Sequence, residues 1–86
     1  MVDLSVIVPA RNAAHLIGDC LRSIAWSAPR EIIVVDGESS DRTAEIARRH
    51  GARVLSDGGA GLPAARLMGA RAAQSAWVAL GSGAAS

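Results

Sequence analysis

Two short runs of mostly β-branched residues constrain the fold of this chain most. The first is Leu4-Ser-Val-Ile-Val8, which Pro9 ends, and the second is Glu31-Ile-Ile-Val-Val35. Both are too short for a helix of ordinary length, so they indicate strands. The second contains four consecutive apolar residues, which is typical of a strand covered on both faces, and such strands are usually parallel. We therefore expect a parallel sheet.

Helical patterns separate and follow these runs. Apolar residues recur on one face between Asn12, which can cap a helix, and Trp26. Similar signals predict two more helices, over 41–50 and from 63 to about 74. Weaker strand signals occupy 53–55 and 76–80. Strand thus alternates with helix four times, which predicts the α/β class with crossover helices.

In such folds ligands bind beyond the carboxyl ends of the strands. We therefore expect functional residues directly after Val8, Val35, Leu55 and Leu80. The rule narrows the search for a site to four short segments.

The size and charge of the chain exclude several classes of protein. Its 86 residues suffice for one small domain or for a piece of a larger one. Nine basic residues, all of them arginine, stand against eight acidic ones. The net charge of +1 indicates no nucleic-acid partner and no attraction to an anionic membrane surface. We attribute the use of arginine alone to a GC-rich, bacterial genome.

Cysteine and histidine offer neither a cross-link nor a structural metal site. Cys20 is the sole cysteine, and His15 and His50 have no zinc-ligand spacing with it. No stretch approaches the roughly 20 apolar residues that span a bilayer, and the N-terminus has no basic leader. We expect no cofactor in this chain, no transmembrane segment and a cytoplasmic location.

The first strand is followed by Pro9-Ala10-Arg11-Asn12, a predicted turn without glycine. A dinucleotide pyrophosphate cannot approach such a backbone as it does in a Rossmann fold. Gly59, Gly61 and Ala64 do form a G-x-G-x-x-A string, but it follows the third predicted strand and contains Pro63. A flexible loop leading into a helix is the favoured interpretation, and a nicotinamide or flavin site is disfavoured.

Carboxylates gather after the second strand, in Asp36-Gly-Glu-Ser-Ser-Asp41. A carboxylate at a strand end can accept hydrogen bonds from the imide or hydroxyl groups of a ligand. A helix N-terminus with acidic caps is the alternative. It explains Ser40, Asp41 and Glu45, but it explains Asp36 less well because Asp36 precedes the turn.

Three motifs follow one another at the predicted strand ends. They are Leu4-Ser-Val-Ile-Val-Pro-Ala-Arg-Asn12, Ile32-Ile-Val-Val-Asp-Gly-Glu-Ser-Ser-Asp-Arg-Thr43 and Gly61-Leu-Pro-Ala-Ala-Arg66, with Gly69, Ala73 and Trp77-Val78 beyond them. Their order and spacing resemble glycosyltransferase family 2. The resemblance implies the N-terminal half of a GT-A fold, a Rossmann-like sheet of about four parallel strands with three crossover helices. It also implies a nucleotide-diphosphate sugar, such as a UDP-sugar, as the donor of intact relatives.

The resemblance assigns nucleotide contacts to seven residues, namely Pro9, Ala10, Arg11, Asn12, Asp36, Asp41 and Arg66. It implies that the turn 9–12 lies along the nucleoside, that Asp36 takes the base or ribose and that Asp41 sits nearby. Arg66 matches the arginine of the family's Ala-Arg-Asn element, whose asparagine is replaced here by Leu67. Two alternatives stay open: Asn12 caps the first helix, and Arg66 is a solvated arginine.

The family's Asp-x-Asp element, which holds Mg²⁺ or Mn²⁺ in full-length relatives, has no counterpart here. Gly81-Ser-Gly-Ala84 takes its place. The resemblance thus implies a partial nucleotide-sugar-binding domain over 1–80, an unstructured tail over 81–86, and a chain that is inactive alone. A frameshift or premature stop is one hypothesis for the change after residue 80.

Two functions stay open. One is a fragment of a sugar-transferring enzyme, and the other is a non-catalytic nucleotide-binding or interaction module that lost the metal site. The fourth strand, at the edge of the expected sheet, would also invite pairing with another chain.

Overall fold

Strands and helices alternate along the chain, as the sequence predicts. The computed structural model describes residues 2–81 and 84–85. Its elements are β1 (Val2–Arg11), α1 (Ala14–Ala25), β2 (Pro29–Asp36), α2 (Thr43–Arg49), β3 (Arg53–Ser56), α3 (Leu62–Ala72), β4 (Trp77–Leu80) and β5 (Ala84–Ala85). None of the helices within 2–81 is long and apolar enough to cross a bilayer.

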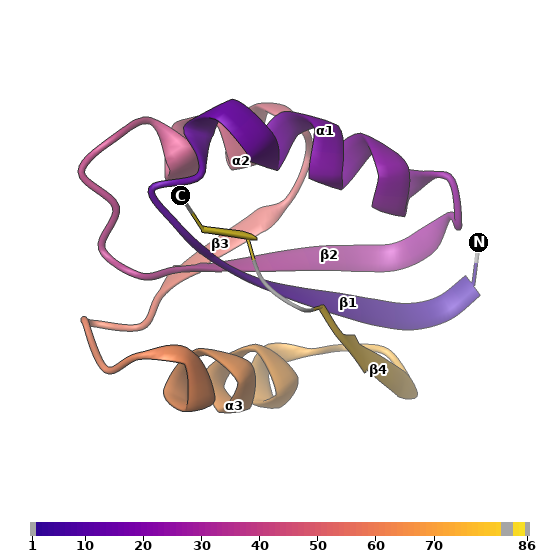
Figure 1. The fold of residues 1–86 in the computed structure, drawn as a ribbon. Helices are drawn as coiled ribbons and strands as arrows, with labels where there is room; N and C mark the ends of the chain where they lie inside the picture. Colours follow the sequence, from indigo (N-terminus) through magenta and orange to yellow (C-terminus); the bar gives the residue numbers. More distant parts are fainter. Residues whose placement is uncertain (1, 82–83, 86) are drawn as a thin grey trace.

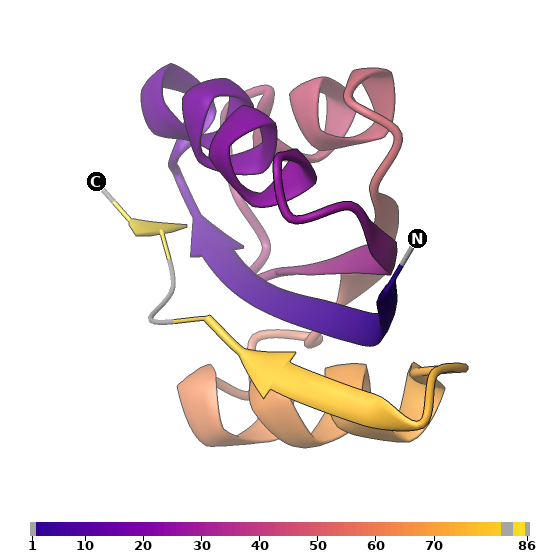
Figure 2. The same ribbon diagram turned by 90° about the vertical axis from the view of Figure 1, so that its right-hand side faces the viewer.

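The strands form one parallel sheet in the order β3-β2-β1-β4, which confirms the predicted α/β class. β1 is central, since Val6 lies opposite Ile32 of β2 and Ala79 of β4. Helices α1 and α2 cover one face of the sheet and α3 covers the other (Figures 1 and 2). The chain therefore winds outward from β1 to β3 along one face and returns to β4 along the opposite face.

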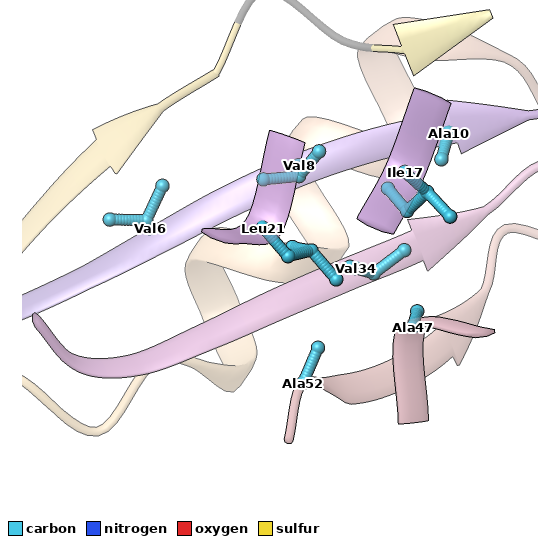
Figure 3. Packing of buried hydrophobic residues seen from close by; sticks show 8 residues of the cluster. All are labelled: Val6, Val8, Ala10, Ile17, Leu21, Val34, Ala47 and Ala52. Atoms are coloured by element: carbon cyan, nitrogen blue, oxygen red, sulfur yellow. The ribbon is translucent and has the colours of Figure 1, made fainter. Parts of the chain in front are cut away.

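Side chains of β1 and β2 alternate between the two faces, which explains why both runs are apolar throughout. Facing α1 and α2 is a buried cluster of Val6, Val8, Ala10, Ile17, Leu21, Val34, Ala47 and Ala52 (Figure 3). Facing α3 is a smaller cluster of Ile7, Ile33, Val35 and Ala65.

Gly69 allows α3 to approach β1 closely. An ideal Cβ built at Gly69 would lie 2.2 Å from Cγ2 of Ile7, which is fully buried. A side chain at position 69 would therefore push α3 away from the sheet.

β1 extends further than predicted, to Arg11 instead of Val8. The prediction ended the strand at Pro9 because proline cannot donate to a ladder. Ile7 O accepts from Gly81 N–H, so the peptide groups of odd-numbered residues in β1 face β4. The nitrogen of Pro9 thus faces the interval between the pairings of β1 with β4, which end at Ile7, and with β5, which begin at Ala10. Proline is tolerated there.

The tail over 81–86 differs from the expectation at two residues. Ala84 and Ala85 form β5, which pairs in parallel with Ala10 and Arg11. Residues 82, 83 and 86 of the predicted tail lie outside the described residues.

Candidate functional site

The carboxyl ends of β1, β2 and β3 and the amino ends of the three helices meet at one edge of the molecule, on the left in Figure 1. In open parallel sheets, ligands bind at this edge where successive connections leave on opposite faces. The connection after β1 leads to β2, whereas the connection before β4 crosses the other face. The fold therefore favours a site beside the end of β1.

The last four residues of the first motif, Pro9 to Asn12, differ in accessibility. Pro9 and Ala10 lie within β1 and are buried, and Ala10 belongs to the core beneath α1. The prediction that they form a turn is wrong, because the ladder continues through them. Arg11 is exposed, and its side chain lies against Gly37. An ideal Cβ built at Gly37 would lie 3.4 Å from Cβ of Arg11. Arg11 and Asn12 are the accessible members of the motif.

Asn12 joins the end of β1 to the loop after β2. Its backbone N–H donates to Ser39 Oγ at 2.8 Å, and its Oδ1 accepts from the N–H and the hydroxyl of Ser40 at 2.8 and 3.2 Å. The backbone of Asn12 is left-handed, with φ of 47°, a conformation that asparagine tolerates. The alternative that Asn12 caps α1 is wrong, because the N-cap is Ala13 and the Asn12 oxygen is bound to Ser40.

Asp36 ends β2, opposite Ala10 in the sheet. Its Oδ1 accepts from the Ser39 hydroxyl at 2.5 Å, and its Oδ2 accepts from the Ser39 N–H at 3.2 Å. Ser39 accepts from Asn12 and donates to Asp36, so one hydroxyl links the ends of β1 and β2. Each carboxylate oxygen still has a lone pair for an N–H or O–H of a ligand.

Asp41 connects the amino ends of α1 and α2. Its Oδ2 accepts from the N–H of Ala14, the first residue of α1, at 3.1 Å. Its Oδ1 accepts from the N–H of Thr43, the first residue of α2, at 3.0 Å, and from the Thr43 hydroxyl. The Thr43 hydroxyl and these backbone N–H groups lower the pKa of the Asp41 carboxyl below 3.8. The prediction that Ser40 or Asp41 caps the second helix is wrong in position, because the N-cap of α2 is Arg42. The Asp41 carboxylate nevertheless accepts from the first N–H of both α1 and α2.

Arg66 lies in the first half of α3 and is half-buried. Within residues 2–81 it makes no hydrogen bond and no ion pair. The Ser39 hydroxyl therefore joins Asn12 to Asp36, and the Thr43 hydroxyl joins Asp41 to the N–H of Ala13, the neighbour of Asn12. Arg66 has no hydrogen bond to either group within residues 2–81.

Sequence reasoning assigned no contact to two acidic residues near this edge, Glu38 and Asp57. Asp57 is 8% exposed, and its carboxylate accepts from the N–H groups of Gly59 and Gly61 at 2.7 and 3.3 Å. An aspartate two residues before a glycine is typical of an Asx turn, so this signal was available. Glu38 has a left-handed backbone, with φ of 56°, and its carboxylate lies against Gly59. No sequence signal marks that conformation for glutamate.

A divalent cation does not fit the residues at this edge. Residues 81–84, where relatives with an Asp-x-Asp element would present two carboxylates, contain no acidic side chain. Across the described part of the chain, no group of three or more His, Cys, Asp or Glu side chains could hold a metal ion. Hard cations such as Mg²⁺ and Mn²⁺ prefer carboxylate oxygens, and residues 2–81 do not gather enough of them in one place to fit such an ion.

Solved structures of two enzymes share this fold. Mannosyl-3-phosphoglycerate synthase from Rubrobacter xylanophilus matches with a TM-score of 0.76 and 30% identity, over 87% of this chain and 28% of that one. Glucosyl-3-phosphoglycerate synthase from Mycobacterium tuberculosis, in complex with Mn²⁺, uridine diphosphate and glucosyl-3-phosphoglycerate, matches with a TM-score of 0.71 and 31% identity. That match covers 90% of this chain and 32% of the synthase.

Sequence comparison gives the same result. A 4,4'-diaponeurosporenoate glycosyltransferase from Staphylococcus haemolyticus is 50% identical over 52 residues, and the Staphylococcus aureus enzyme is 43% identical over 53 residues. The matches cover 59% and 60% of this chain, which spans 14% of the length of each relative. The sequence profile of glycosyl transferase family 2 matches residues 5–80. The chain therefore belongs to glycosyl transferase family 2.

Proposed function

We propose that this chain is the nucleotide-binding part of a glycosyltransferase and holds the nucleoside diphosphate portion of a nucleotide-sugar such as a UDP-sugar. The observation that carries the proposal is the edge at which Ser39 links Asn12 and Asp36, in a chain of this family. Uridine diphosphate is bound in the Mycobacterium relative, which supports the same ligand class here.

The accessible groups at the edge suit such a ligand. Asp36 accepts hydrogen bonds, which fits an imide N–H of a base or a ribose hydroxyl. Arg11 and Arg66 supply guanidinium groups, which pair with phosphate oxygens or base carbonyls. Pro9 and Ala10 contribute to the site indirectly, because they form the buried end of β1. Asp41 contributes by holding the amino ends of α1 and α2.

The proposal for this chain stops at binding. We propose a partial domain over 1–80, and we assign sugar transfer to a longer protein with a divalent cation such as the Mn²⁺ of the Mycobacterium complex. Residues 81–84 lack carboxylates, so nucleotide binding by this chain is expected to be independent of metal.

Calorimetric titration with UDP tests the proposal, with ADP as the comparison ligand and with or without Mn²⁺. Asp36→Ala is expected to abolish saturable binding, whereas Asp3→Ala, at the opposite end of the sheet, keeps it. Arg66→Ala is expected to weaken binding about tenfold, the effect of one charge-assisted hydrogen bond, while Arg71→Ala on the same helix has no effect. Equal UDP affinity in the Asp36 and Asp3 variants would contradict the proposal.

A second candidate is a non-catalytic nucleotide-binding module. The absence of carboxylates from residues 81–84 favours this module, because the site then lacks the ligands for a metal ion that would assist transfer. Both candidates predict UDP binding, and they differ in transfer. If a longer natural form of this chain, given a UDP-sugar and Mn²⁺, releases no UDP, the module is supported and the enzyme fragment is rejected.

We also propose that the chain self-associates through β4. Trp77, Val78 and Leu80 of this edge strand are exposed, by 74%, 41% and 54%, and the strand carries no charge. Within residues 2–81 and 84–85, no strand pairs with its outer edge. An uncharged apolar edge can pair with a second copy without like-charge repulsion, whereas the β3 edge begins with the exposed Arg53.

A further inference from the structure

The end of β1 is tied to the loop after β2 by hydrogen bonds at consecutive residues. Asn12 N–H donates to Ser39, Ala13 N–H donates to Thr43 Oγ1 at 2.9 Å, and Ala14 N–H donates to Asp41. These three amides lead from the strand into α1, so their acceptors fix the path of the chain between the two elements.

Thr43 is the buried centre of this connection. Its hydroxyl donates to Asp41, which leaves the oxygen lone pairs of Thr43 free to accept from Ala13. Without the Asp41 carboxylate the Thr43 hydroxyl could rotate, and its oxygen would then no longer present a lone pair to the N–H of Ala13. The side chain of Thr43 is fully buried, so an unpaired N–H at Ala13 would find no water in its place.

Asp41 meets three donors: the N–H of Ala14, the N–H of Thr43 and the hydroxyl of Thr43. Only a carboxylate provides two acceptor oxygens with the required lone pairs. An amide would turn its NH₂ group toward one of these donors. Oδ1 of Asp41 thus accepts from two donors and Oδ2 from one, and the donors belong to two helices. Each oxygen of Asp36 accepts from a single donor, and both donors belong to Ser39.

We infer that Asp41 is a positioning residue: through Ala14 and Thr43 it sets the conformation of Asn12 and the end of β1 that receives the nucleotide. Only the effect of Asp41 on nucleotide binding rests on the proposed function. The positioning of residues 12–14 stands on the hydrogen bonds alone and can be measured without a ligand.

The test compares Asp41→Asn with Asp19→Asn, which removes the same charge from the exposed face of α1. Amide hydrogen exchange by NMR is measured at Asn12, Ala13 and Ala14, with the core amides of β1 and β2 as the reference. UDP titration of the same samples gives the dissociation constant. The 86-residue chain is used throughout.

We expect exchange at Ala13 and Ala14 to rise about tenfold or more in Asp41→Asn, while the core amides stay protected. The UDP dissociation constant is expected to rise at least about fivefold, and Asp19→Asn to match the wild type in both. Thr43→Val should reproduce the change at Ala13, and Thr43→Ser, which keeps the hydroxyl, should restore it.

Different results overturn different claims. Wild-type exchange at Ala13 and Ala14 in folded Asp41→Asn would refute the positioning role. Faster exchange with an unchanged dissociation constant would show that the geometry does not serve the nucleotide. A wild-type chain that does not bind UDP would refute the proposed function, while the exchange data still decide the role of Asp41.

If Asp41→Asn does not fold, the wild type supplies the measurement. The amide proton shift of Ala14 should follow the titration of the Asp41 carboxyl as the pH falls. An Ala14 shift that is independent of pH would refute the contact.

Discussion

Replacement of Gly69 tests the close packing of α3 against β1. Replacing Gly69 by alanine places a Cβ 2.2 Å from Cγ2 of Ile7, whereas ordinary contacts begin at 3.4 Å. Relief requires a movement of about 1.2 Å. Ile7 is fully buried at the centre of β1 and cannot turn into solvent, so α3 must move away from the sheet.

The expected cost follows from these distances. Overpacking of this kind destabilises by about 1–3 kcal/mol. The higher helix propensity of alanine offsets about 0.5–1 kcal/mol of it. We expect Gly69→Ala to lower the free energy of unfolding by up to about 2.5 kcal/mol, and the upper value is a large share of the stability of so small a domain.

Gly18 in α1 is the matched control. A Cβ there would meet Nε2 of His50 at 3.1 Å, and the exposed imidazole can turn away. Gly18→Ala should therefore leave stability unchanged or raise it by up to about 1 kcal/mol. Urea unfolding followed by circular dichroism measures both midpoints, with equal slopes as the condition for comparison. If the two variants unfold at the same urea concentration, the close approach of α3 to β1 is incorrect.

Further predictions concern two left-handed residues, the Glu31 carboxylate and the edge strand β4. Glu38→Gly and Ala28→Gly both relieve left-handed backbones, with φ of 56° and 49°, and should raise stability by about 0.5–1 kcal/mol; a lower urea midpoint for either would contradict this. Burial raises the pKa of Glu31, but hydrogen bonds from Ser5 and the Gln74 N–H and the charges of Arg53 and Arg30 outweigh it and hold the pKa below 4.5. Because its pKa is lower in the folded state, ionised Glu31 stabilises the fold above the unfolded-state pKa, and this stabilisation is lost as the pH falls through the folded-state pKa. Glu31→Gln should therefore flatten the loss of stability below about pH 4.5, and an unchanged pH profile would refute this. Val78→Lys in β4 should reduce self-association in sedimentation velocity, whereas Ser56→Lys at the β3 edge should not, and equal sedimentation of all three proteins would exclude pairing through β4.

The layered fold was predictable because its signals are local. The β-branched runs and the helical spacing in between identify β1, α1 and β2 without knowledge of their neighbours. Pro9 misled the prediction, since its place in β1 depends on a pairing interval between β4 and β5 that no local pattern reveals.

The candidate site was predictable in its position and not in its contacts. Asp36 was expected at a strand end and lies there. The acceptors for Asn12 and Ala14 come from Ser39 and Asp41, 27 residues away in each case. Long-range partners of this kind depend on the packing of α1 beside α2, which the sequence of either helix does not encode alone.

Nucleotide binding at the carboxyl ends of β1 and β2 can be observed residue by residue by NMR. Amide chemical shifts of the 86-residue chain are recorded while UDP is added. We expect saturable shifts confined to Arg11–Ala14, to Asp36–Ser40 and to the first turns of α3, with none at the amino ends of β1 and β2. Shifts centred on the amino ends of the strands, or no saturable shift at all, would contradict this expectation.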